Sequence, residues 1–328
     1  MPVRILTAQE DLRKYDRWLK SHPQGSLWQS LEWEKFQEHA GRETRVYIAE
    51  EGNAILAGAL VLIDRTALNW CVWEMRRGPI LGVGGGGSGS ADLMNAIIND
   101  ARKNNCLALL LSPSEFLRPT PYTLRPSRRH LMPEATRIID LTKSDDAILA
   151  QMKPKGRYNI GVAEKNRVVI QRSTDIDALY TLLKETGGRD GFGILPKSHY
   201  EAFLKHLEGS FLFLAYGANP NPISGLLGVI WNGTGIYYYG ASNYAHRALM
   251  APYALQWAAM RHCKAQGATK YDLLGIAPPG SPAGHPWTGI SSFKEKFGGD
   301  VVTYPPEQMT VLRPWAWRAL QIKRKIWR

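Results

Sequence analysis

The chain has 328 residues, 44% of them hydrophobic, and its 41 lysines and arginines against 29 aspartates and glutamates give a net charge of +12. This length exceeds the size at which a single hydrophobic core keeps growing, so we expect two domains. The charge favours a polyanionic partner, such as a nucleic acid, a nucleotide sugar or an anionic membrane face. A basic surface that only keeps the protein soluble is the alternative.

The cysteines and apolar segments exclude several protein classes. Cys71, Cys106 and Cys263 are scattered singly, which gives no disulfide framework or zinc motif and fits a reducing cytosol. The amino terminus lacks an apolar signal core, and no apolar run approaches the roughly 18 residues of a membrane-spanning helix. We therefore expect a cytoplasmic protein, either free or peripheral at the inner face of the membrane.

The first half of the chain predicts a helix, a hairpin and a strand, helix, strand unit. Residues 30–41 predict a helix capped by Ser30, and residues 44–64 predict two strands around the turn EEGN. A tryptophan-rich strand and a glycine-rich stretch follow. A helix over 91–105 and a buried strand over 106–114 complete the unit.

The second half predicts the same order of elements: a helix over 196–209, a hairpin over 210–232, and then a strand, a helix and a strand over 235–242, 249–267 and 268–276. This order is that of the N-acetyltransferase (GNAT) fold. The predicted fold class is α/β, with two tandem GNAT-like domains, each a mixed sheet flanked by helices.

We place the first domain at 1–145 and the second at 146–312. The carboxyl end, RPWAWRALQIKRKIWR over 313–328, predicts a basic, tryptophan-rich helix. Either it packs its apolar side on the first domain with its cations solvated, or it contacts anionic lipid or a tRNA backbone.

The chain resembles the FemAB family in the segments GRYNIGVAEKNRVVI, GFGILPKSHYEAFL, HRALMAPYALQWAAMRHCKAQGATKYDLLGI and FKEKFGG. The earlier segments SLWQSLEWEKFQEHAG and RRGPIL are similar to the amino-terminal half of that family. Its members are aminoacyl-tRNA-dependent transferases of peptidoglycan bridge synthesis. The order and spacing of the segments make the resemblance more specific than any single one.

The resemblance implies transfer of an amino acid from aminoacyl-tRNA to an amine of the peptidoglycan stem peptide, on a UDP-muropeptide or its lipid-linked successor. A neutral amine attacks an activated ester, so the reaction needs positioning and charge stabilisation, and no cofactor. A CoA-dependent N-acyltransferase of the same fold and a non-catalytic RNA- or membrane-binding protein are the alternatives. The transferred amino acid and the general base are not predicted.

The segment KPKGRYNI carries three cations, Lys153, Lys155 and Arg157, near the amino end of a predicted helix. Because Pro154 and Gly156 discourage a regular helix, we expect it to begin near Arg157. A helix dipole repels cations there, but cations and free N–H groups together would bind an anion such as a phosphate. A solvated basic linker is the alternative.

Four further residues are assigned to substrate binding: Lys35, Tyr158, Tyr239 and Arg247. Lys35 should point away from the core tryptophan of its helix, and the resemblance implies an acceptor pocket with basic and aromatic residues in this region. Tyr239 is expected to share one face of its strand with Tyr237, because side chains alternate along a strand.

Three residues at the start of the long helix distinguish the types of transferase. CoA-dependent enzymes of this fold usually carry Arg/Gln-x-x-Gly-x-Gly/Ala, whose amides wrap the pyrophosphate. Here Arg247 is followed by Met250 and by Pro252, which has no N–H. This disfavours CoA, although Arg247 beside a helix start could still hold a phosphate.

Lys294 in SSFKEKFGG is the candidate catalytic residue. Phe293 and Phe297, spaced i, i+4, would anchor one face of a short helical turn while Lys294 points elsewhere. The resemblance implies a basic residue beside the reacting ester, where an ammonium could stabilise the oxyanion. A surface lysine, like Lys296, is the alternative.

The remaining motifs give no further functional assignment. The glycine-rich stretch 82–90 lacks a P-loop ending and is interpreted as a flexible connection. The histidines show no ligand spacing, so no metal is predicted, and no G-x-S-x-G supports a serine nucleophile. Many family members have an acidic residue where this chain has Ser112 before Pro113, so a general base there is in doubt. Asp272 is interpreted as structural.

Overall fold

The computed structural model describes residues 1–66, 69–82, 87–116, 123–127 and 129–326. The chain forms two compact units. One contains Met1–Met132 together with Tyr304–Arg328, and the other contains Pro133–Thr303. The chain therefore leaves the first unit once and returns to it, which differs from the expected consecutive domains 1–145 and 146–312.

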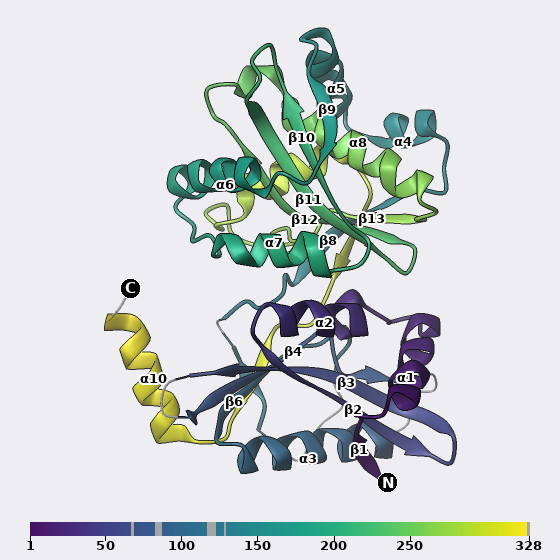
Figure 1. The fold of residues 1–328 in the computed structure, drawn as a ribbon, viewed down its shortest axis with the longest axis vertical. Coiled ribbons are helices and arrows are strands. Elements are labelled where there is room, and N and C mark those ends of the chain that lie inside the picture. Colours follow the sequence, from purple (N-terminus) through teal and green to yellow (C-terminus); the bar gives the residue numbers. More distant parts are fainter. Residues whose placement is uncertain (67–68, 83–86, 117–122, 128, 327–328) are drawn as a thin grey trace. The chain divides into compact units, whose positions relative to one another are not determined.

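The first unit contains these elements (Figure 1): β1 Val3–Ile5, α1 Gln9–Ser21, the 3₁₀ helix η1 Leu27–Gln29, α2 Leu31–His39, β2 Glu43–Glu51, β3 Ala54–Arg65, β4 Cys71–Arg76, β5 Ile80–Leu81, α3 Gly87–Lys103, β6 Cys106–Ser112, β7 Arg125–Pro126, β15 Gln308–Val311 and α10 Pro314–Ile326.

The described strands of this unit form one sheet in the order β1, β2, β3, β4, β6, β15, β7, with β5 paired to β3. β4 and β6 are parallel, as the predicted strand, helix, strand unit requires. Helix α3 covers one face of the sheet and buries Ile97 and Ile98 against residues such as Trp73 and Leu109. Helices α1 and α2 contact β3 and β2.

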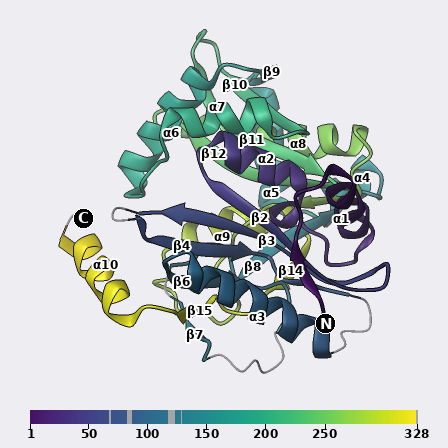
Figure 2. The ribbon, with the colours of Figure 1, turned by 60° about the horizontal axis from the view of Figure 1, so that its bottom comes forward.

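The second unit contains these elements (Figures 1 and 2): β8 Ala135–Asp140, α4 Asp145–Gln151, α5 Pro154–Lys165, β9 Val169–Ser173, α6 Ile176–Asp190, α7 Lys197–His206, β10 Ser210–Tyr216, β11 Pro222–Trp231, β12 Thr234–Ser242, the 3₁₀ helix η3 Arg247–Leu249, α8 Ala251–Ala265, β13 Lys270–Asp272, α9 Thr288–Lys294, the 3₁₀ helix η4 Glu295–Phe297 and β14 Asp300–Thr303.

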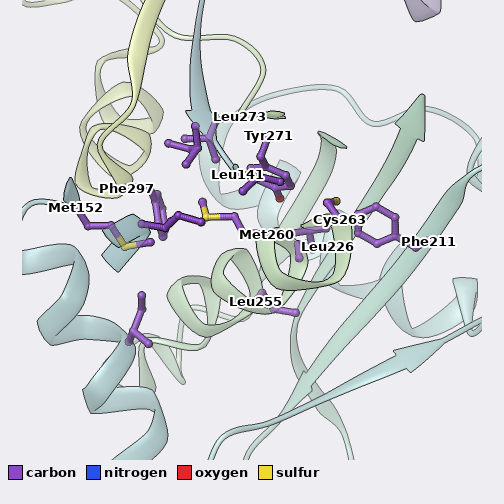
Figure 3. Close-up of a cluster of buried hydrophobic side chains, with 14 of the residues drawn as sticks. Leu141, Met152, Phe211, Leu226, Leu255, Met260, Cys263, Tyr271, Leu273 and Phe297 are labelled. Carbon is purple, nitrogen blue, oxygen red and sulfur yellow. The ribbon is translucent and has the colours of Figure 1, made fainter. Parts of the chain in front are cut away.

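Its described strands form a second sheet in the order β14, β8, β13, β12, β11, β10, β9. Helix α8 packs on this sheet through Leu255, Met260 and Cys263, which meet Phe211 and Tyr271 in a buried cluster (Figure 3). Helix α6 contacts β11 and β12, and helix α7 contacts β10. The site described below lies in this unit.

Two strands depart from the expected domain boundaries. β8 precedes residue 145 but pairs with β13 and β14 of the second unit. β15 follows the second unit but pairs with β6 and β7 of the first. Exchanged strands of this kind leave no local sequence signal, because their partners lie far away in the chain.

Most predicted helices and hairpins are confirmed, including α2 with the Ser30 hydroxyl accepting from the Trp33 amide. Helix α3 begins earlier than predicted, at Gly87, so the end of the glycine-rich stretch is helical. Residues 83–86 of that stretch lie outside the described residues. Helices α1, α4 and α6 were not predicted.

Glu74 on β4 forms a charged cluster in the first unit. Its carboxylate is 1% exposed and accepts from Arg76 at 2.8 Å and from Arg42 at 3.1 Å, and Arg129 lies 3.7 Å away. Burial raises the pKa of Glu74, but the three arginines outweigh burial and hold this pKa below its ordinary value. The Glu74 carboxylate is therefore negatively charged, and the three arginines balance its charge.

Candidate functional site

The site begins where two parallel strands separate. β12 pairs with β13 only from Thr234 to Ile236, after which β13 ends at Asp272 and β12 continues to Ser242. The sheet is therefore open beyond Ile236. An opening at the carboxyl ends of parallel strands is where open α/β sheets usually bind ligands.

A pocket of about 300 Å³ lies against this part of β12. Its walls come from the end of α6, the start of β11, the second half of β12, the start of α8, and α9. Its lining includes Arg189, Tyr237, Arg247, Gln256 and Phe293. The predicted substrate residue Arg247 thus lines the pocket, and the candidate Lys294 directly follows a lining residue.

The prediction that Tyr237 and Tyr239 share one face of their strand is wrong. Leu227 of β11 pairs with Tyr239 while Gly228 pairs with Tyr237, so Tyr238 is an extra residue in a β-bulge. The bulge turns Tyr239 toward α7, where its hydroxyl shares a 2.8 Å hydrogen bond with the His199 Nε2. Tyr237 is the tyrosine that faces the pocket.

Gly240 makes room for Tyr237. A Cβ at Gly240 would overlap the Tyr237 hydroxyl and ring edge, so a larger residue here would displace this tyrosine. Burial raises the pKa of Tyr237 to about 12, partly opposed by its hydrogen bond to Gln256. The Gln256 side chain also accepts from the Tyr271 hydroxyl at 2.9 Å. Tyr237 is therefore a fixed, protonated hydroxyl at the inner wall of the pocket.

Lys294 occupies the opening between the two strands. Its side chain is 6% exposed, and its ammonium donates to the carbonyl of Leu274 and, at 2.7 Å, to that of Gly275. The ammonium also lies 5.5 Å from the centre of the Tyr237 ring. The alternative of a surface lysine is therefore wrong: Lys294 is buried behind Tyr237.

The turn after β13 holds Lys294 in place. The Asp272 carboxylate accepts from the Thr136 hydroxyl and, at 2.7 Å, from the Leu274 amide, which fixes the turn whose carbonyls bind Lys294. Burial lowers the pKa of Lys294 to about 7, and the charge of Asp272 opposes this only in part. These contacts agree with the structural interpretation of Asp272.

The amides of the turn that leads into α8 are largely occupied. Hydrogen bonds to backbone carbonyls occupy the N–H groups of Arg247, Leu249 and Met250 at 3.0–3.2 Å, and Pro252 has none. Met250 has a φ of 55°, in the left-handed region, which turns the chain from η3 into α8. A pyrophosphate cradle of the CoA type would need these amides.

Two arginines flank an exposed aromatic ring at the rim of this pocket. The Arg247 guanidinium lies 4.1 Å from the centre of the Tyr244 ring, and the Arg189 guanidinium lies 5.5 Å from it. Tyr244 is 57% exposed. The rim thus combines cations with a stacking surface, which suits a single-stranded nucleic acid end.

The expected start of the cation-bearing helix is wrong. Helix α5 begins at Pro154 rather than near Arg157, because proline is well tolerated in the first helical turn. Arg157 donates to the carbonyls of Ala150 (3.1 Å) and Met152 at the end of α4, where a cation is favourable. Lys153 pairs with Glu295.

Lys155 and Tyr158 remain at the surface of α5. Tyr158 is 63% exposed, and the Lys155 ammonium lies 5.0 Å from the centre of its ring. Among the described residues, Lys155 has no hydrogen bond or ion pair. The amino end of α5 also contacts η4, since the Lys153 amide donates to the Lys296 carbonyl at 3.1 Å. These residues therefore lie beside the segment that carries Lys294.

In the first unit, Lys35 is exposed and Trp33 is only 1% exposed. This agrees with the prediction that the two side chains point in different directions from α2.

A carboxylate that the sequence analysis did not identify lies at the end of β6. Glu307 is 2% exposed and accepts from the Ser112 hydroxyl at 3.1 Å and from the Leu131 amide at 2.5 Å. Glu307 immediately precedes β15, in the segment with which the chain returns to the first unit. Because it lies 195 positions from Ser112 in the sequence, no local motif could indicate that the two side chains meet.

The described residues contain no group of three or more His, Cys, Asp or Glu side chains that could hold a metal ion. Within the same residues, no helix has the length and apolar character needed to cross a bilayer.

The chain is similar to known proteins over most of its length. The model of the FemAB family matches residues 7–129 and 212–325. A lipid II:glycine glycyltransferase of Staphylococcus saprophyticus is 20% identical, over 87% of this chain and 88% of that protein. The protein of the same name from Staphylococcus aureus is 23% identical over 58% of this chain, an alignment that spans only 49% of that relative.

Two solved structures share the fold. The crystal structure of FemX matches with a TM-score of 0.75 and 18% identity, over 97% of this chain and 99% of that one. A tandem GNAT protein from the clavulanic acid biosynthesis pathway matches with a TM-score of 0.57 and 11% identity, over 94% and 98%. The predicted fold class of two tandem GNAT-like domains is confirmed, and so is the resemblance that the sequence segments indicated.

Proposed function

We propose, on the premise that this chain belongs to the FemAB family, that it is an aminoacyltransferase of peptidoglycan bridge formation. It moves an amino acid from aminoacyl-tRNA to an amine of the stem peptide. The acceptor is a lipid-linked precursor, as in the names of the staphylococcal relatives, or the UDP-muropeptide that precedes it. The protein acts in the cytoplasm.

The pocket of the second unit is the observation that carries this proposal. It holds a protonated tyrosine on its inner wall, a buried lysine behind that tyrosine, and two arginines at its rim. An ester in this pocket would meet groups that stabilise negative charge on its carbonyl oxygen. Acyl transfer from an activated ester requires positioning and such charge stabilisation, without a nucleophilic side chain.

The occupied amides in the turn before α8 favour aminoacyl-tRNA over CoA as the donor. The stacking surface of Tyr244 between two arginines supports the same choice, because bases stack on aromatic rings while cations contact the backbone.

The test incubates the purified protein with a mixture of charged tRNAs and either UDP-muropeptide or the lipid-linked precursor, and reads product masses. We expect a mass increase of one or more amino acid residues on the acceptor, which also identifies the amino acid. Acyl transfer from acetyl-CoA, or a large melting shift with acetyl-CoA and none with precursor, would instead support the CoA-dependent alternative.

Lys155 is expected to bind an anionic group of a substrate. Changing Lys155 to Gln should weaken substrate binding and lower the slope of log affinity against log salt by about one, since one fewer counterion is released. Thermal stability should not change, because this side chain is exposed.

Changing Arg157 to Gln is the matched comparison. It removes hydrogen bonds to carbonyls at the end of α4, so we expect a loss of about 1 kcal/mol in the free energy of unfolding. If Lys155→Gln leaves both affinity and salt slope unchanged, Lys155 is a solvated surface cation.

A further inference from the structure

Helix α10 is anchored to the first unit by one side only. Trp317 is 5% exposed and belongs to a cluster with Leu107 and Leu110 of β6. Ala316 and Leu320 pack against the same cluster. In Figure 1 the helix begins near β6 and its carboxyl end is directed away from the sheet.

The opposite side of α10 carries large apolar residues that nothing in the described chain covers. Trp315 is 81% exposed and Ile322 is 61% exposed. Together with Arg318 they are spaced i, i+3, i+7, which places all three on one stripe of the helix. The Arg318 guanidinium lies 5.5 Å from the centre of the Trp315 ring. We define Trp315, Arg318 and Ile322 as the α10 stripe.

All charged residues of the segment that contains this stripe are basic. Residues 313–328 contain six lysines and arginines and no acidic residue. Glu307 is the last acidic residue of the sequence. A short helix in a basic segment, with an exposed tryptophan and an exposed isoleucine, has the character of a segment that lies in the interface of a membrane.

We propose that α10 docks this protein on an anionic phospholipid surface, with the α10 stripe inserted among the lipids and its cations against the headgroups. RNA is less well matched: bases could stack on Trp315 and cations could contact the backbone, but RNA would leave the exposed Ile322 in water. A bilayer accommodates the tryptophan, the isoleucine and the cations together. The inference concerns membrane binding and does not depend on the proposed transfer reaction.

Flotation of the full-length protein with vesicles tests this proposal. The wild-type protein should float with vesicles that contain phosphatidylglycerol and remain unbound with vesicles of phosphatidylcholine alone. The double substitution Trp315→Ser and Ile322→Ser should lower the partition coefficient by about tenfold or more. Neither change touches the anchored side of α10, so the melting temperature should be unchanged.

The matched control is Ile5→Ser, at an apolar residue of β1 that is 41% exposed and lies outside α10. It should bind vesicles like the wild type. The proposal is overturned if wild-type protein does not float with phosphatidylglycerol vesicles, or if the double variant floats equally well. A double variant that loses tRNA affinity but keeps vesicle binding would assign the stripe to RNA instead.

Discussion

Replacing Lys294 with methionine is expected to slow single-turnover aminoacyl transfer by about 10²–10³-fold while leaving precursor affinity nearly intact, the effect typical of losing one oxyanion donor. An ammonium has three N–H donors, and two of those in Lys294 are directed at the carbonyls of Leu274 and Gly275. The ammonium also lies 5.5 Å from the centre of the ring of Tyr237, which lines the pocket. The positive charge is thus held at a fixed position when the ester carbonyl acquires negative charge.

The comparison is Lys296→Met, two residues away. The Lys296 ammonium donates to the Ser292 carbonyl at 2.6 Å and is more exposed, so we expect little change in rate. Equal and small effects of both substitutions would make Lys294 a structural residue.

The pH dependence of the transfer rate shows whether Lys294 acts as a charged ammonium or as a neutral amine. Because its pKa is about 7, the ammonium is present below that value and is lost as pH rises through it. The rate should therefore show a descending limb near pH 7 that is absent in Lys294→Met. In Lys294→Arg, which keeps its charge, the limb should also disappear while more activity remains.

As pH rises, the stability of the wild-type protein should increase, whereas its rate should fall. The folded-state pKa of Lys294 lies below that of an unfolded lysine, so the unfolded chain binds more protons between about pH 7 and 10. The free energy of unfolding gains a contribution as pH rises through this window, and Lys294→Met should remove that gain. Chemical denaturation at several pH values measures it.

Replacing Glu74 with leucine is expected to lower the free energy of unfolding by about 3 kcal/mol. The substitution removes the carboxylate that compensates Arg42, Arg76 and Arg129. Because these arginines are 16–31% exposed and can turn toward water, the loss should lie at the low end of the range for broken buried ion pairs.

Glu43→Leu is the matched control for Glu74. Glu43 also pairs with two arginines, Arg45 and Arg65, but its side chain is 35% exposed, so removing it should cost less than about 1 kcal/mol. Similar losses for the two variants would show that burial adds nothing to the Glu74 cluster.

The Glu74 contribution should also depend on pH. Its folded-state pKa is lowered, so its stabilisation is complete above the ordinary glutamate pKa of about 4.3 and is lost as pH falls through the folded value. The difference in unfolding free energy between wild type and Glu74→Gln should shrink below about pH 4. A constant difference would mean that Glu74 acts through its shape and not its charge.

Local sequence patterns were sufficient to predict many of the secondary-structure elements of this protein and the order in which they follow one another. The alternation and spacing of apolar residues predicted the hairpins and the long helices α3 and α8, because each pattern depends on residues a few positions apart. The repeated order of elements predicted the tandem fold. The pair Phe293 and Phe297 likewise indicated a helical turn that holds Lys294, and Phe297 is fully buried.

The tertiary structure decided the features that depend on distant partners. The bulge at Tyr238 arises from pairing with β11, and this extra residue decided that Tyr237, rather than Tyr239, faces the pocket. Arg157 found its acceptors at the end of a different helix, and Glu307 met Ser112 across 195 positions of sequence. Strand alternation and helix spacing are local rules, whereas register, burial and ion pairing depend on which segments the folded chain brings together.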